Sequence, residues 1–125
     1  MNILVIDDSA TTRGLLKRAL LQSCEDSVVR EASDGKSAIH ELALGKVDLI
    51  TTDLEMPGID GHRFLETLQR NPLLRRKKVL VFSSAITPEL RKKFSDNPNI
   101  AFLNKPASNQ AIADTVLGLM AQSPA

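Results

Sequence analysis

Three acidic side chains directly follow two apolar segments of this chain. Asp7 and Asp8 come after Ile3–Ile6, and Asp53 comes after Asp48–Thr52. If both segments are strands of one parallel sheet, their carboxyl ends meet at one edge and the three carboxylates crowd together. Crowded carboxylates repel one another, so they must take up protons or share a cation. An all-oxygen site with room for water suits Mg²⁺, or Mn²⁺ in its place, and we therefore expect a metal site here.

A hydroxyl and an ammonium group stand near the ends of two later apolar segments. Ser83 follows Val79–Phe82, and Lys105 comes shortly after Ile100–Leu103. A carboxylate can attack phosphorus as a nucleophile and form an acyl phosphate. Lys105 and a metal ion would neutralise the charge of the transferred group, and the Ser83 hydroxyl would donate to one of its oxygens. These residue types together predict phosphoryl transfer to a carboxylate.

Such a site needs a sheet whose strands all end at the same edge. Five short segments alternate with longer amphipathic ones, and the predicted strands are Ile3–Ile6, Ser27–Ala32, Asp48–Thr52, Val79–Phe82 and Ile100–Leu103. Four of them are near-continuous apolar runs, which favours strands covered on both faces. Ser27–Ala32 is more polar and is predicted to lie at a sheet edge. Strict βα alternation implies parallel strands with right-handed crossovers, and hence an α/β three-layer sandwich.

Apolar residues at helical spacing place helices between these strands. The stripes comprise Leu15, Leu16, Ala19 and Leu20; Ala38, Ile39, Leu42 and Ala43; Phe64, Leu65 and Leu68; and Ile112, Val116, Leu117 and Met120. Gly45 is predicted to cap the second helix. Asp60 is predicted to cap the third, which begins at Gly61. Thr87–Phe94 is predicted as a short helix with Pro88 at its first position, and its apolar stripe is the weakest.

Length and composition narrow the class of protein. The 125 residues suffice for one domain, predicted over 1–121, with 122–125 as a frayed tail. A net charge of +1 argues against bulk attraction to nucleic acid or to membranes. The apolar runs are too short to cross a bilayer, and the N-terminus lacks the features of a signal peptide. With Cys24 as the single cysteine, we expect a cytoplasmic monomer or weak dimer.

The run DLEMPGIDG at Asp53–Gly61 follows the third predicted strand. It resembles the loop after the phosphoaccepting aspartate in the receiver domains of two-component response regulators, the CheY-like family. Asp7-Asp8 resembles the acidic metal-binding pair of that family. Ser83 resembles its strand-end Ser or Thr, and Lys105-Pro106 resembles its lysine–proline step. The resemblance covers essentially the whole chain and implies a flavodoxin-like (βα)5 fold with strand order 2-1-3-4-5.

Specific roles in phosphoryl transfer follow from the resemblance. It implies that Asp53 is the phosphoacceptor and that Ser83 and Lys105 bind the phosphoryl group. It also implies a cis peptide bond at Lys105–Pro106. Ser83 and Phe102 are the implied switch residues, and Phe102 lacks the hydroxyl that many relatives carry at this place.

The resemblance also implies a Mg²⁺ ligand set and partners. Asp8 and Asp53 would ligate the ion directly, Asp7 directly or through water, and Glu55 through its backbone carbonyl. The implied phosphodonor is a histidine kinase or a histidine phosphotransfer protein. Phosphorylation would change the face of the fourth helix and the fifth strand, which an unidentified protein partner would recognise.

Several functional classes stay open beside this interpretation. The chain is expected to catalyse only its own phosphorylation and dephosphorylation, without direct nucleic acid binding. It could act alone in chemotaxis or a phosphorelay, or be a receiver fragment of a longer response regulator or hybrid kinase. A haloacid-dehalogenase-type phosphatase would need Asp-x-Asp on the first strand, which Asp7-Asp8-Ser9 does not provide. A docking module that no longer uses phosphate is disfavoured by the complete acidic site.

Other conspicuous residues are interpreted structurally. His40 and His62 have no metal-ligand companions and are predicted to be solvated. Cys24 is predicted to pack at a helix end, and Met56 and Pro57 are predicted to shape the loop after Asp53.

Two basic runs interrupt the second half of the chain. Neither Arg75–Lys78 nor Arg91–Lys93 has the interleaved aromatic residues of a surface that stacks nucleic acid bases. The first is interpreted as a solvated loop, and the second as a contribution to a partner-binding face.

Overall fold

The computed structural model describes residues 1–56 and 59–121. Its helices are α1 (Ala10–Ser23), α2 (Gly35–Leu44), α3 (Gly61–Arg70), the 3₁₀ turn η1 (Leu74–Arg76), α4 (Pro88–Lys93) and α5 (Asn109–Met120). Its strands are β1 (Asn2–Ile6), β2 (Val28–Ala32), β3 (Leu49–Thr52), β4 (Glu55–Met56), β5 (Ile59–Asp60), β6 (Lys78–Ser83) and β7 (Ile100–Asn104). The predictions for Pro57 and for the tail at 122–125 lie outside the described residues.

Five strands form one parallel sheet in the order β2-β1-β3-β6-β7. When the strands of this sheet alone are counted, this is the order 2-1-3-4-5, and the flavodoxin-like prediction is confirmed. β4 and β5 pair separately as a small antiparallel hairpin. The sequence did not predict this hairpin, because strands of two residues leave no periodic pattern to detect.

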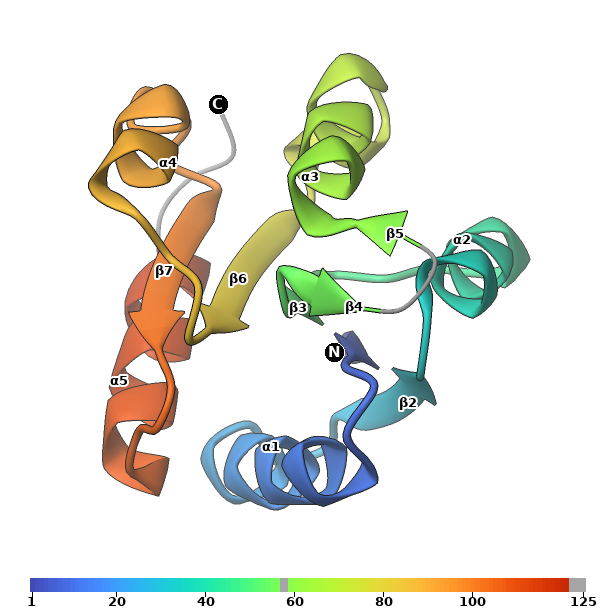
Figure 1. Ribbon diagram of the computed structural model, residues 1–125. Helices are drawn as coiled ribbons and strands as arrows, with labels where there is room; N and C mark the ends of the chain where they lie inside the picture. The colour runs from blue at the N-terminus through green and yellow to red at the C-terminus, as the bar shows by residue number, and fades with distance from the viewer. Residues whose placement is uncertain (57–58, 122–125) are drawn as a thin grey trace.

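Two helical layers enclose the sheet (Figure 1). α1 and α5 pack on one face, whereas α2, α3 and α4 pack on the other. Ile3 and Val5 of β1 enter the core with α1 and α5, and Leu4 and Ile6 enter the opposite core. This burial on both faces explains why the central strands are continuous apolar runs. β2 lies at a sheet edge, as predicted, and its Val28 is 56% exposed.

Polar caps begin the helices at the predicted places. At the start of α3, the Asp60 carboxylate accepts a hydrogen bond from the His62 backbone N–H at 2.9 Å. At the start of α4, the Thr87 hydroxyl accepts from the Leu90 backbone N–H at 3.1 Å. Gly45 ends α2 as predicted, but its φ of −174° is extended. The predicted cap position is therefore confirmed, without the left-handed conformation that many C-terminal glycines adopt.

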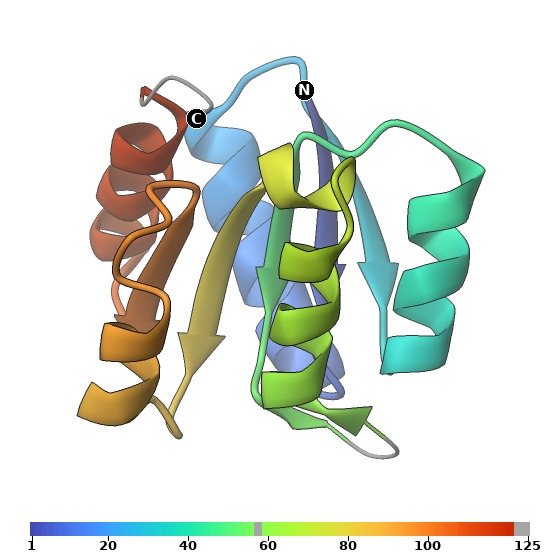
Figure 2. The ribbon, with the colours of Figure 1, turned by 90° about the horizontal axis from the view of Figure 1, so that it is seen from above.

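All five parallel strands point toward the same end of the molecule (Figure 2). The β4–β5 hairpin lies at this end, whereas η1 and the α4–β7 connection lie at the other. Among the described residues, no helix is long and apolar enough to span a bilayer. The polar residues that follow the strands thus lie together at the carboxyl ends of the strands.

Candidate functional site

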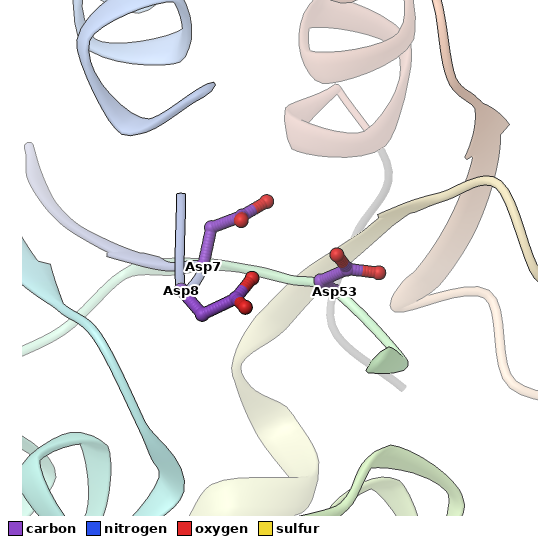
Figure 3. Close-up of side chains that lie close together, drawn as sticks. All are labelled: Asp7, Asp8 and Asp53. Carbon is purple, nitrogen blue, oxygen red and sulfur yellow. The ribbon is translucent and has the colours of Figure 1, made fainter. Parts of the chain in front are cut away.

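The three predicted carboxylates form a cluster at the strand ends. β1 and β3 are neighbours with Ile6 opposite Thr52, so the residues that follow them are brought together. Carboxylate oxygens of Asp7, Asp8 and Asp53 all lie within 4.8 Å of one another. Figure 3 shows these three side chains close together. Asp7 and Asp53 are buried, whereas Asp8 is exposed. Two carboxylates of the cluster are therefore buried, and the third is accessible to solvent.

Lys105 supplies the positive charge at this cluster. It follows β7, and its peptide bond to Pro106 is cis, as the resemblance implied. Its Nζ donates to Asp7 Oδ2 at 2.8 Å and to Asp53 Oδ2 at 2.9 Å. Burial alone would lower the pKa of Lys105, but the hydrogen bonds and charges of the two aspartates outweigh it and raise that pKa. Lys105 is therefore a charged bridge between the first and third strand ends.

Asp53 is held as an ionised carboxylate. Its Oδ1 accepts from the Leu54 backbone N–H at 2.7 Å and from the Glu55 backbone N–H at 3.2 Å. Burial alone would raise the pKa of Asp53, but hydrogen bonds from Ser83, Lys105 and Glu55 lower it below the usual range. At neutral pH this side chain thus carries the charged oxygens that a nucleophile requires.

Ser83 is fully buried at the end of β6 beside Asp53. Its Oγ accepts from the Ala85 backbone N–H at 3.1 Å. The hydroxyl is therefore anchored to the turn that leads to α4. The neighbouring Ser84 is exposed. The structure thus brings Ser83, and not Ser84, to the carboxylate cluster.

The donor set fits a hard divalent cation. Asp7 Oδ2 is occupied by Lys105, and its Oδ1 accepts from the Ser9 backbone N–H at 2.9 Å. The carboxylate of Asp8 has no hydrogen-bond or ion-pair partner among residues 1–56 and 59–121. Carboxylate oxygens beside open solvent are the ligands that Mg²⁺ prefers, because this ion keeps several waters. Glu55, the predicted backbone ligand, begins β4 two residues after Asp53.

One residue that the sequence reasoning missed is Arg13 of α1. Its guanidinium donates to the backbone carbonyl of Asp7 at 2.7 Å and to the Glu31 carboxylate at 3.1 Å. These contacts fix the backbone turn that presents Asp7 and Asp8. A lone arginine in a helix gives no signal of this role in the sequence, because the contact depends on how α1 crosses the sheet.

Gly61 is a second residue whose role the sequence did not show, although it predicted the helix start. A Cβ at Gly61 would lie 2.5 Å from both the Cα and the carbonyl oxygen of Leu54. The Leu54 backbone N–H is a donor to Asp53. The close approach therefore lets α3 begin directly against the loop that holds the phosphoacceptor candidate.

We expect Gly61→Ala to destabilise the fold by about 1–3 kcal/mol, since rigid backbone must move to admit the methyl group. Urea unfolding followed by circular dichroism measures this free energy. Gly14→Ala is the matched control, because nothing lies within 4 Å of its added Cβ and Gly14 is an exposed residue of α1. This control should gain about 0.5–1 kcal/mol from helix propensity. Equal stability of Gly61→Ala and wild type would contradict the close-approach argument.

The remaining residues singled out in the sequence lie outside the cluster. Phe102 of β7 is half-buried, packs against the α2–α3–α4 core, and has the Arg91 guanidinium carbon 5.7 Å from its ring centroid. His40 and His62 are exposed, as predicted. Cys24 caps the end of α1 and packs against the α1–α5 core, again as predicted.

Sequence comparisons identify relatives over most of the chain. The family described as "Response regulator receiver domain" matches residues 3–117. The gliding motility regulatory protein of Myxococcus xanthus is 34% identical over 108 residues, which cover 84% of this chain and 13% of that protein. A protein-glutamate methylesterase/protein-glutamine glutaminase of Rhodospirillum centenum is 38% identical over 86 residues, or 68% of this chain and 21% of that protein. The chain thus spans about a fifth or less of the length of these relatives.

Solved structures of low identity share the fold. The chemotaxis response regulator CheY4 of Vibrio cholerae has a TM-score of 0.81 at 21% identity, covering 94% of this chain and 97% of that one. A receiver domain from Colwellia psychrerythraea has a TM-score of 0.85 at 21% identity, covering 98% and 99%. With the family match over residues 3–117, these findings show that the chain belongs to the response regulator receiver domain family.

Proposed function

We propose that this receiver domain is a phosphorylation switch in which Asp53 accepts a phosphoryl group in a Mg²⁺-dependent reaction. The observation that carries the proposal is the Lys105 ammonium group, which bridges Asp7 and Asp53 inside a cluster of three carboxylates. A cluster that served only stability would gain little from this crowding of charge. A site that must receive a dianionic group benefits from a fixed cation and a further binding place for a metal.

The chemistry assigns one task to each residue. An oxygen of Asp53 attacks the phosphorus of a partner's phosphohistidine, so that an O–P bond forms as the P–N bond breaks and the released imidazole takes up a proton. When bound to Asp7, Asp8, Asp53 and the Glu55 carbonyl, Mg²⁺ or Mn²⁺ would neutralise charge on the transferred group. Lys105 binds one phosphoryl oxygen with its ammonium group. The Ser83 hydroxyl donates to another.

Signalling would pass from this site to the α4–β7 face. Ser83 would turn toward the phosphoryl group and change the turn that leads to α4, and Phe102 would repack on β7. A histidine kinase or histidine phosphotransfer protein would be the donor, and another protein would recognise the changed face. The domain would work in the cytoplasm as a monomer or weak dimer, alone or as part of a longer regulator. Its only catalysis would be its own phosphorylation and dephosphorylation.

Intact mass after incubation with acetyl phosphate tests the proposal. We expect wild-type protein to gain one phosphoryl group with Mg²⁺ and none after chelation by EDTA. The same samples are then offered a purified phosphorylated histidine phosphotransfer protein as donor. Equal uptake with and without Mg²⁺ would contradict the metal requirement. No uptake from either donor by the folded protein would contradict the proposed function.

A further inference from the structure

Charge is distributed very unevenly along this nearly neutral chain. Residues 61–99 contain nine basic and three acidic side chains, a formal charge of +6. The rest of the chain contains seven basic and twelve acidic side chains, a formal charge of −5. The small net charge therefore conceals a strongly basic segment. Such a segment creates a local field that attracts anionic partners even where the whole protein does not.

The fold gathers part of this segment around a hollow. A cavity of about 360 Å³ is lined by η1 and the α4–β7 connection, including Arg75, Arg76 and Asn97. A second cavity of about 230 Å³ shares Arg75 and Asn97 and extends to Lys93. A third of about 360 Å³ shares Arg76 and extends to Leu73. We call the surface formed by Leu73, Arg75, Arg76, Lys77, Lys93 and Asn97 the basic groove.

The two arginines of the basic groove are available to a ligand. Arg75 and Arg76 are exposed, and no carboxylate pairs with either of them within residues 1–56 and 59–121. Lys93 is already paired with Glu66. Asp96 also lines the first cavity. The two arginines therefore leave an excess of positive charge there, which Asp96 partly offsets. Unpaired guanidinium groups are well suited to bind carboxylates in a bidentate manner.

The basic groove also has a rigid floor and an apolar end. Asn99 is 2% exposed, accepts a hydrogen bond from Lys78 Nζ at 2.8 Å, and contacts the Arg75 carbonyl through its amide at 3.4 Å. The backbone that carries Arg75 is thus tied to the start of β7. Leu73 is 80% exposed and leaves a large apolar side chain beside Arg76. A ligand with carboxylates and an apolar side chain would complement both the arginines and Leu73.

We propose that the basic groove docks an acidic segment of a partner protein, with carboxylates on Arg75 and Arg76 and an apolar side chain on Leu73. A single-stranded nucleic acid held by base stacking is the less suitable occupant, because such stacking uses exposed aromatic rings. The aromatic ring lining these cavities is Phe94, which is 8% exposed. Carboxylates on a short peptide need only the guanidinium groups and the apolar contact that the groove provides.

Docking at the basic groove would not compete with phosphoryl transfer. η1 and the α4–β7 connection lie at the opposite end of the sheet from the hairpin that follows Asp53 (Figure 2). A partner held there leaves the carboxylate cluster open to a phosphodonor. The inference therefore does not rest on phosphorylation, and it is tested on unphosphorylated protein without Mg²⁺.

The test uses a fluorescein-labelled synthetic peptide of glutamates around one leucine, with binding followed by fluorescence anisotropy. We expect the double variant Arg75→Glu/Arg76→Glu to weaken binding by about tenfold or more, since attraction becomes repulsion. The control variant Lys17→Glu/Arg18→Glu makes the same change of net charge at two exposed residues of α1. It should change the affinity by about twofold or less, because distant charges are screened. Equal losses in both variants would overturn the proposal.

Backbone amide NMR shifts locate the peptide and guard against misfolded variants. When the peptide is added to wild-type protein, we expect the amide resonances of η1 and of the α4–β7 connection to shift. Fewer resonances should shift when the leucine of the peptide is replaced by glycine. Shifts confined to α1 or α5, or no binding at all, would overturn the proposal. A single-stranded DNA oligonucleotide that bound the same groove more tightly than the peptide would overturn the choice of an acidic protein segment.

Discussion

We expect Asp53→Asn to abolish phosphoryl uptake from acetyl phosphate and to leave the fold intact. The amide has nearly the shape of the carboxylate, and its oxygen can still accept from the Leu54 N–H, a contact of 2.7 Å in the wild type. It lacks the charged oxygen that must attack phosphorus. Intact mass, measured over the time in which wild-type protein is fully modified, tests for this loss. Circular dichroism tests whether the variant is folded.

A distant aspartate provides the control for this experiment. Asp114 is exposed on α5, where its carboxylate accepts a hydrogen bond from Gln110 at 2.7 Å. Asp114→Asn removes the same charge and should take up the phosphoryl group as wild type does. Undiminished uptake in Asp53→Asn would mean that another group is the nucleophile. The buried Asp7 and the exposed Asp8 would then be the candidates to replace next.

The strands of the sheet could be predicted because burial determines their sequences, whereas the strand order followed from the family resemblance. β1, β3 and β6 are covered on both faces, so their residues are continuous apolar or β-branched runs that mark the strand ends to within a residue. The polar residue after such a run must lie at the carboxyl edge of the sheet. Asp7, Asp8 and Asp53 were therefore placed together without any knowledge of distances, and their oxygens do lie within 4.8 Å.

Features that depend on tertiary geometry could not be predicted in this way. The β4–β5 hairpin has strands of two residues, which are shorter than any hydrophobic period. The contact of Gly61 with Leu54 depends on where α3 meets the loop after β3, and the sequence shows only a glycine after a capping aspartate. Gly45 ends α2 as the sequence predicted, but its extended backbone depends on the tertiary setting and could not be predicted from the residue type.

The position of the Lys105 ammonium group is likewise a result of tertiary structure. Its partners Asp7 and Asp53 are 98 and 52 residues away in the sequence, and only the closure of the sheet brings Nζ to within 3 Å of both. The sequence identified Lys105 through its proline neighbour and its place after the fifth strand of the sheet. It could not show that one ammonium group bridges two strand ends.

We expect Lys105→Met to slow phosphoryl uptake by about 10²–10³-fold at saturating Mg²⁺, the usual loss when one charge-stabilising donor is removed from an active site. Methionine keeps an unbranched, flexible side chain beside Phe82 but cannot donate a hydrogen bond or carry charge. In the same variant, Mg²⁺ should bind more tightly, because Asp7 and Asp53 lose the cation that now balances them. Intact-mass time courses give the rate, and isothermal titration calorimetry gives the Mg²⁺ affinity.

The two readouts separate a direct role from an indirect one. If Lys105 only positioned the carboxylates, Mg²⁺ affinity would change while the rate at saturating metal stayed near the wild-type value. If it binds the transferred group, the rate falls although metal binding improves. Lys46→Met removes an exposed lysine charge beyond the end of α2 and should alter neither quantity by more than about twofold. Opposite movements of rate and affinity in Lys105→Met alone would identify its ammonium group as a ligand of the phosphoryl oxygens.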